Sequence, residues 1–221
     1  MAARIAVAIE QAPKRSFALA IDWPGWARSG KDPPAAVRAL TDAAVRYAIV
    51  ARAAGESFPV GELECVVVET NEGGSGTDFG VPSRVTNADR RPTSAAEAER
   101  LVRLLAVAWA RFETVAEAAP ESLHKGPRGG GRDTSKIVAH VIESDWYYAK
   151  EIGVRIRQPS PADPGAIAAM RDAMLEVLAR QSDGSPLAGR TWTARYAAAR
   201  IAWHALDHAW EIEDRSEPRA G

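Results

Sequence analysis

Residues 193–214 read TARYAAARIAWHALDHAWEIED, and this stretch decides how the C-terminal half of the chain folds. It contains neither proline nor glycine, and alanine is its commonest residue, which favours an α-helix. Apolar residues and histidines recur in it every three or four positions, so one face of the helix is predicted to point inward. The predicted inner face consists of Ala197, Ile201, His204, Ala205, His208 and Ile212.

Three further amphipathic helices are predicted upstream of this one. The first covers residues 94–119, the second begins at Asp133 or Thr134, and the third covers about 165–181. Four such helices are the material of a helix bundle. We therefore expect a four-helix bundle over residues 94–215, followed by a short tail at 216–221.

The N-terminal part has a different pattern. Residues 4–11 and 17–22 alternate between apolar and polar side chains, which predicts a β-hairpin. Two prolines after Asp32 are typical of a helix start, and the helix is expected to reach Ala54, where Gly55 ends it. Residues 63–69 then predict a returning strand.

A small β-β-α-β domain is therefore predicted at residues 1–70. Residues 71–93, rich in Gly, Ser, Asn, Asp and Pro, are interpreted as a linker. The predicted fold class is α+β, with this small domain followed by the helix bundle.

Composition excludes several classes of protein. The 221 residues include 28 Lys plus Arg and 29 Asp plus Glu, a net charge of −1, which argues against a general nucleic-acid binder. A single cysteine excludes a disulfide framework. The apolar run at residues 5–9 is cut off by Glu10 and is too short for a signal peptide or a membrane span. The sequence thus predicts a cytoplasmic protein.

Histidine is scarce, and its placement is the main functional signal. Of four histidines, three fall on predicted inner faces: His140 on the second helix of the bundle, and His204 and His208 on the last. A spacing of four stacks two side chains on one helical face. Three imidazoles that converge can bind Zn²⁺, Ni²⁺ or Fe²⁺ and leave a coordination position open. The alternative is that each is a hydrogen-bonded core residue.

The segments around these histidines resemble a known family. TSKIVAHVIE at 134–143 and WHALDHAWE at 203–211 resemble the DinB-like metal-binding bundles, in which one histidine comes from the second helix and an HxxxH pair from the last. The resemblance implies a divalent metal bound by His140, His204 and His208, and a homodimer. It also implies activity on a small-molecule electrophile, because characterised relatives are transferases and isomerases that use bacillithiol, mycothiol or glutathione.

The N-terminal segment FALAIDWPG at 17–25, followed by SGKD at 29–32, is similar to the HicB-like domain. Nothing in it resembles the ribbon-helix-helix that HicB antitoxins use to bind DNA. Residues 1–70 contain no histidine, so the catalytic residue of the paired ribonucleases is absent. We interpret this domain as a module for interaction or for shaping the site.

Charged residues near the histidines are candidate accessory groups. Lys125, Arg128 and Arg132 lie in a glycine-rich loop before the second helix of the bundle, where they could bind an anionic substrate group. Glu143 and Glu211 each follow a histidine by three residues and could orient an imidazole or act as a general base. The alternatives are a solvated loop and surface salt bridges.

Three hypotheses about function remain at this point. The first is an enzyme in which a metal held by three histidines activates a thiol or water. The second is an interaction protein, in which the HicB-like half binds a protein partner and the bundle dimerises. The third is a structural bundle whose histidines have lost their role.

Overall fold

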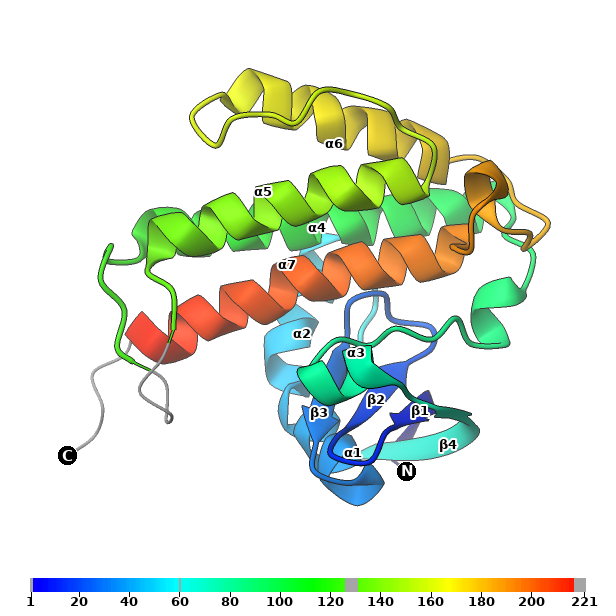
Figure 1. Ribbon diagram of the computed structural model, residues 1–221. Coiled ribbons are helices and arrows are strands. Elements are labelled where there is room, and N and C mark those ends of the chain that lie inside the picture. The colour runs from blue at the N-terminus through cyan, green and yellow to red at the C-terminus, as the bar shows by residue number, and fades with distance from the viewer. Residues whose placement is uncertain (1, 60, 126–130, 217–221) are drawn as a thin grey trace.

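The computed structural model describes residues 2–59, 61–125 and 131–216. It shows a mixed α+β structure in which a four-stranded sheet near the N-terminus is followed by a helical region (Figure 1). This architecture confirms the predicted α+β class. The HicB-like and DinB-like assignments within it remain predictions.

The sheet consists of β1 (Ala3–Gln11), β2 (Ser16–Ala20), β3 (Ala27–Gly30) and β4 (Leu63–Glu72), in the order β3-β2-β1-β4. Strands β1 and β2 form the predicted antiparallel hairpin. Strand β4 runs parallel to β1, as a strand does when helices form the crossover between the two. The buried side chains of β1 include those of Ile5, Val7 and Ile9, which share one face because side chains alternate along a strand.

The order β-β-α-β predicted for this part is corrected at two points. Strand β3 follows the turn at 23–26 and pairs antiparallel with β2; at four residues it is too short to show a period-two pattern. The helix predicted to reach Ala54 is divided at Ala43 into α1 (Pro33–Asp42) and α2 (Ala44–Ala53). The division lets α1 cover the sheet while α2 contacts the helical region.

The segment interpreted as a linker is packed against the sheet. It contains α3 (Ser75–Phe79) and a short 3₁₀ helix, η1 (Ala88–Arg90). Glu10 of β1, only 1% exposed, accepts hydrogen bonds from the backbone amides of Ser83 at 2.9 Å and Arg84 at 3.0 Å. A buried carboxylate satisfied in this way fixes the segment to the sheet.

The helical region contains α4 (Ala95–Ala118), α5 (Thr134–Glu151), α6 (Pro164–Leu178) and α7 (Ala194–Ser216). Ser94 and Asp163 cap α4 and α6 by accepting hydrogen bonds from backbone amides in the first turn of each helix. Helices α4, α5 and α7 lie alongside one another, and α6 packs against α4 and α5 (Figure 1). Between α6 and α7 lies a second short 3₁₀ helix, η2 (Leu187–Gly189).

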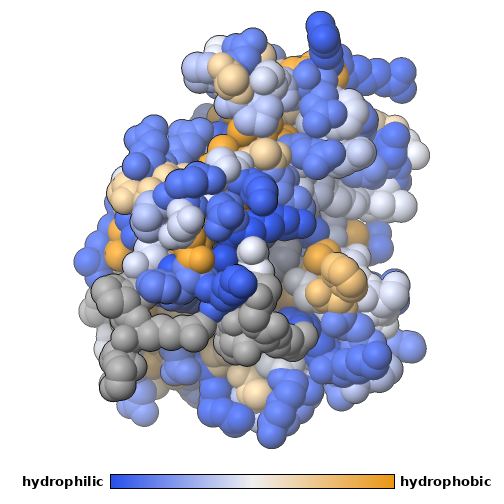
Figure 2. All heavy atoms as spheres, turned by 60° about the vertical axis from the view of Figure 1, so that its left-hand side comes forward, coloured by the Kyte–Doolittle hydropathy of each residue, from blue (hydrophilic) through white to orange (hydrophobic). Residues whose placement is uncertain are grey.

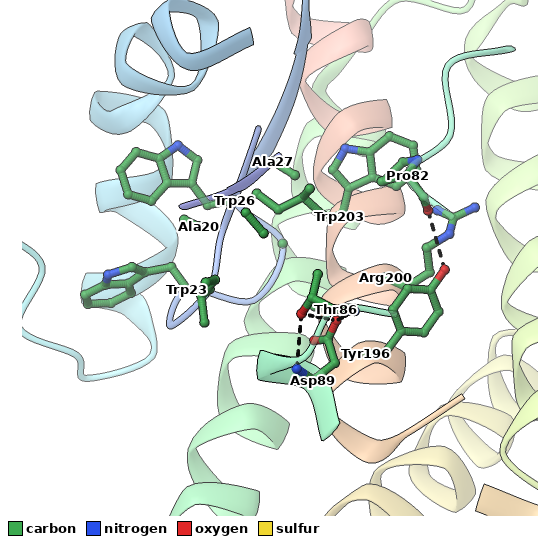
Figure 3. Close-up of a pocket in the computed structure, with 15 residues that line it drawn as sticks. Ala20, Trp23, Trp26, Ala27, Pro82, Thr86, Asp89, Tyr196, Arg200 and Trp203 are labelled. Atoms are coloured by element: carbon green, nitrogen blue, oxygen red, sulfur yellow. Dashed lines mark hydrogen bonds between the residues drawn. The ribbon is translucent and has the colours of Figure 1, made fainter. Parts of the chain in front are cut away.

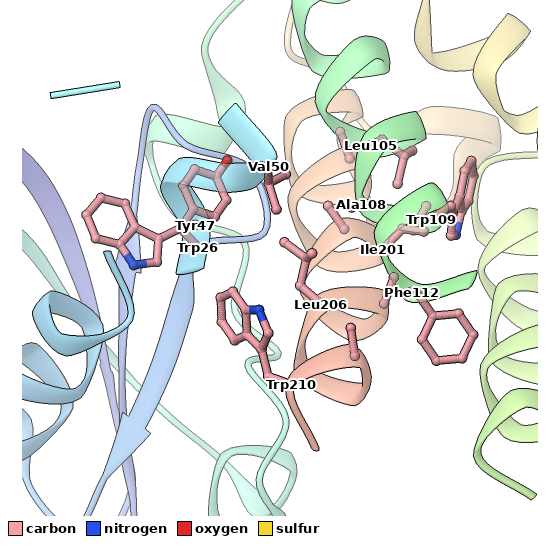
Figure 4. Close-up of a cluster of buried hydrophobic side chains, with 14 of the residues drawn as sticks. Trp26, Tyr47, Val50, Leu105, Ala108, Trp109, Phe112, Ile201, Leu206 and Trp210 are labelled. Atoms are coloured by element: carbon pink, nitrogen blue, oxygen red, sulfur yellow. The ribbon is translucent and has the colours of Figure 1, made fainter. Parts of the chain in front are cut away.

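One hydrophobic core extends from the sheet into the helices. Trp26 and Tyr47 stack with ring centres 5.5 Å apart, and Figure 4 shows them facing Leu206 and Trp210 of α7. Gly25, with φ of +90°, lies so close to α7 that an added Cβ would be 2.9 Å from Ala202. The sheet and the helices therefore pack as one body around α7, which places α7 at the centre of the molecule.

The surface gives two further facts. Among the described residues, no helix is both long and apolar enough to cross a membrane. The face that Figure 2 shows is mainly hydrophilic, with apolar side chains scattered over it rather than gathered in one patch.

Candidate metal centre

Two helices bring three histidines together. His140 comes from α5, and His204 and His208 lie one turn apart on α7. The ring centres are 5.2 Å apart for His140 and His204, 5.1 Å for His140 and His208, and 4.7 Å for His204 and His208. One nitrogen from each ring lies within 4.8 Å of the other two. The predicted convergence of the three rings is thus present in the structure.

The cluster is closed on one side and open on the other. His204 is 6% exposed, and its ring packs against those of His140 and Tyr148 on α5. The side chain of His208 is 13% exposed, and His140 is partly exposed. A small molecule can therefore approach from the side of His140 and His208.

The environment keeps two of these imidazoles neutral. Burial lowers the pKa of His140 to about 4, and the positive charge of Arg132 acts in the same direction. Burial also holds the pKa of His204 well below its usual range. A neutral imidazole has a lone pair on one nitrogen, so His140 and His204 can act as ligands at pH 7.

Glu211 fixes the orientation of His208. One oxygen of Glu211 lies 2.8 Å from Nδ1 of His208, and the other accepts a hydrogen bond of 2.8 Å from Arg215. Burial alone would raise the pKa of Glu211, but the hydrogen bonds from His208 and Arg215 outweigh it and lower the pKa. Because an ionised carboxylate only accepts, Nδ1 carries the proton and Nε2 of His208 is left as the ligand atom. Because both carboxylate oxygens of Glu211 are engaged in these contacts, we interpret Glu211 as a residue that positions His208.

The two glutamates that follow a histidine by three residues have different surroundings in the structure. Glu143 is exposed, and its carboxylate makes no hydrogen bond to a histidine in the described part of the chain. Asp207, between the two histidines of α7, forms an ion pair of 2.9 Å with Arg28 of β3. Within residues 2–59, 61–125 and 131–216, Glu211 is therefore the acidic residue whose carboxylate contacts a histidine of the cluster.

The predicted basic loop is described in part. Arg128 falls within 126–130, outside the described residues. Lys125 and Arg132 are exposed at the two ends of that gap. Arg132 is close enough to the cluster for its charge to lower the pKa values of His140 and His204.

Two residues at the site were not predicted from the sequence. Tyr148 of α5 lies with its ring 5.6 Å from that of His204 and nearly perpendicular to it. Arg215 holds Glu211 and also donates a hydrogen bond of 2.8 Å to the carbonyl of His124. A signal for Arg215 was present, since it follows Glu211 by four residues, the spacing of a helical ion pair. The placement of Tyr148 against His204 depends on how α5 packs on α7.

Comparison with known proteins found no family model, no curated protein and no solved structure that matches the chain. The DinB-like and HicB-like resemblances are therefore carried only by the short segments quoted above. A function has to be inferred from the residues that the fold brings together.

Proposed function

We propose that the chain is a metalloprotein in which His140, His204 and His208 hold one divalent metal ion. The observation that carries the proposal is the convergence of three imidazole nitrogens within 4.8 Å of one another from two separate helices. Nitrogen ligands of this kind suit Zn²⁺, Ni²⁺ and Fe²⁺. The carboxylate that orients His208 adds the support that metal-binding histidines usually have from their second nitrogen.

A purely structural role fits His204 less well. A buried polar group in a protein core is normally hydrogen-bonded. Nδ1 of His204 is buried and has no hydrogen-bond partner among the residues that the structure describes. A histidine cluster that served packing alone would leave this atom unsatisfied, whereas a cluster that binds a ligand has a reason to keep it available.

The proposed activity is thiol-dependent transfer to, or isomerisation of, a small electrophile. A metal held by three protein ligands would leave a coordination position open, and it would lower the pKa of a thiol or water bound there. The chain has one cysteine, Cys65, on strand β4 and away from the cluster, so the thiol would come from a small cosubstrate. The exposed charge of Arg132 would attract an acidic cosubstrate towards the open side of the site.

Metal content tests the metal site directly. Purified protein is loaded with Zn²⁺, desalted and analysed by inductively coupled plasma mass spectrometry. We expect stoichiometric metal in the native chain and its near-complete loss in His204→Ala. His124→Ala is the matched control, because His124 is exposed and its backbone makes the contacts to Arg215. Equally low metal in all three proteins would refute the proposal.

A second candidate function, binding of a protein partner, is favoured by strand β4. It lies at the edge of the sheet and exposes Val67 (48%) and Val68 (58%). An exposed apolar edge strand is a template for pairing with another chain, such as a second copy in a homodimer. Light scattering after size exclusion tests this: Val68→Lys should shift a dimer to monomer, with or without chelator, and a native monomer would count against it.

A further inference from the structure

Arg200 is buried beside the histidine cluster. It lies one helical turn before His204 on α7 and is only 8% exposed. Its guanidinium carbon lies 5.1 Å from the ring centre of Tyr148 on α5 and 4.7 Å from that of Trp203. The Tyr148 ring also contacts His204, with the two ring centres 5.6 Å apart. Arg200 and His204 therefore share an aromatic neighbour at the contact between α5 and α7.

The charge of Arg200 has no acidic partner within the described residues. No carboxylate there lies within ion-pair distance of it, and its Nη1 is buried without a hydrogen-bond partner. Asp207, the acid nearest to it along α7, is paired with Arg28. Contacts with aromatic faces offset part of the cost of burying a charge, but they leave the N–H groups without acceptors. Such a group is poised to bind an anion from outside the chain.

The cavity between the sheet and α7 is too small to hold such an anion. Its volume is about 40 Å³, which is room for about three water molecules. Figure 3 shows the guanidinium of Arg200 turned away from Trp23 and Trp26, on the side where Tyr196 lies. Since it also lies over Tyr148, the guanidinium is directed to the α5 side of α7, which is the side of the histidines.

We propose that Arg200 binds the carboxylate of a small organic acid that reacts at the histidine cluster; this substrate class rests on the proposed function. A guanidinium is planar and offers paired N–H donors that match the two oxygens of a carboxylate. The rings of Tyr148 and Trp203 hold it in one orientation. Arg200 and His204 are four residues apart, about 6 Å along the helix. The guanidinium carbon of Arg200 and the ring of His204 lie 5.1 Å and 5.6 Å from the centre of the same Tyr148 ring, so one small acid can reach both groups.

The test measures carboxylate binding with and without metal. Native protein, Arg200→Met and Arg200→Lys are titrated calorimetrically, before and after loading with Zn²⁺. The probes are succinate, glutathione and, as uncharged control, succinamide. Succinate presents carboxylates without sulfur, and glutathione presents them on a thiol, so the two arms show which reactant carries the acid. Arg155→Met, which removes an exposed arginine far from the histidines in the sequence, is the matched control.

We expect at least one acidic probe to bind the native protein at least tenfold more tightly than Arg200→Met. Arg200→Lys should bind with intermediate affinity, because it keeps the charge but loses the paired donors. Arg155→Met should match the native protein, and succinamide should not bind. Carboxylate binding that depends on Arg200, in a protein that takes up no Zn²⁺, would uphold this inference while the metal proposal failed. No acidic probe binding, or equal binding by Arg200→Met, would overturn it.

Discussion

Arg171 and Arg200 are two buried arginines in the same helical region, and their surroundings are similar up to a point. They are 7% and 8% exposed. Each guanidinium lies over a tryptophan, at 4.9 Å from the ring centre of Trp109 for Arg171 and at 4.7 Å from that of Trp203 for Arg200. Burial and aromatic contact are thus nearly the same for the two arginines. They differ in their acidic partners.

The partners of Arg171 come from inside the protein. Asp145, fully buried on α5, lies 3.1 Å from it, and Glu113 of α4 forms a second ion pair. Arg200 has no such carboxylate in the described part of the chain. Arg171 is therefore a complete structural element that ties α6 to α4 and α5. Arg200, at the histidine cluster, is a charge that the protein leaves for a ligand.

The largest expected effect is on the free energy of unfolding, and substitution of only one of the two arginines should produce it. Arg171→Met leaves Asp145 buried without its partner, and we expect the free energy of unfolding to fall by about 3–5 kcal/mol. Arg200→Met leaves no buried acidic group without its partner. We therefore expect the free energy of unfolding to fall by less than about 1 kcal/mol, or to rise. Urea unfolding followed by circular dichroism measures both. Equal losses in the two variants would break the comparison.

The pH dependence of stability tests how Asp145 is held. Burial raises its pKa from 3.8 to about 6, outweighing the attraction of Arg171. A carboxyl whose pKa is raised in the folded state binds its proton more tightly there, so its contribution to stability is present below pH 3.8 and lost as the pH rises through about 6. The change is about 3 kcal/mol at most.

Asp145→Asn isolates this effect from the other carboxylates. Relative to Asp145→Asn, the native protein should become less stable as the pH rises from 4 to 7. Urea titrations of both proteins at each pH measure this difference in unfolding free energy. A constant difference over that range would mean that Arg171 holds Asp145 at its usual pKa.

The smallest predicted effect concerns the two glutamates that follow a histidine by three residues. Glu211→Gln removes the charge that orients His208, and we expect the affinity for Zn²⁺ to fall about 10–100-fold. Glu143→Gln should leave it unchanged, because Glu143 is exposed and makes no contact of this kind. Competition with a chromophoric chelator measures both. Equal affinities in the two variants would show that the His208–Glu211 contact has no bearing on the metal.

The helices could be predicted from the sequence because their signals are long and local. The prediction at 94–119 corresponds to α4 (Ala95–Ala118), and that at 193–214 to α7 (Ala194–Ser216). The short strand β3 and the division of the first helix at Ala43 were not predicted. Both depend on how the segment packs against the sheet and α4, which a local pattern does not encode.

The same limit applies to the site. The stacking of His204 and His208 follows from helical periodicity, and His140 needed only a facing helix. The contrast between Glu211 and Glu143 could not be predicted, since the spacing is the same for both. It depends on Arg215 and on the rotation of α5 against α7. The burial of Arg200 without an acidic partner is likewise a property of the packed structure, because Tyr148 of α5 covers it.

The most direct test of the three-histidine site is the visible absorption of the chain on titration with Co²⁺, an ion whose spectrum reports its ligands. We predict that a stoichiometric amount of Co²⁺ gives the intense bands of a four- or five-coordinate nitrogen site, that Zn²⁺ abolishes them, and that His204→Ala never develops them while His124→Ala does. A spectrum that stays that of hydrated Co²⁺, or one that is the same in His204→Ala, would contradict the account.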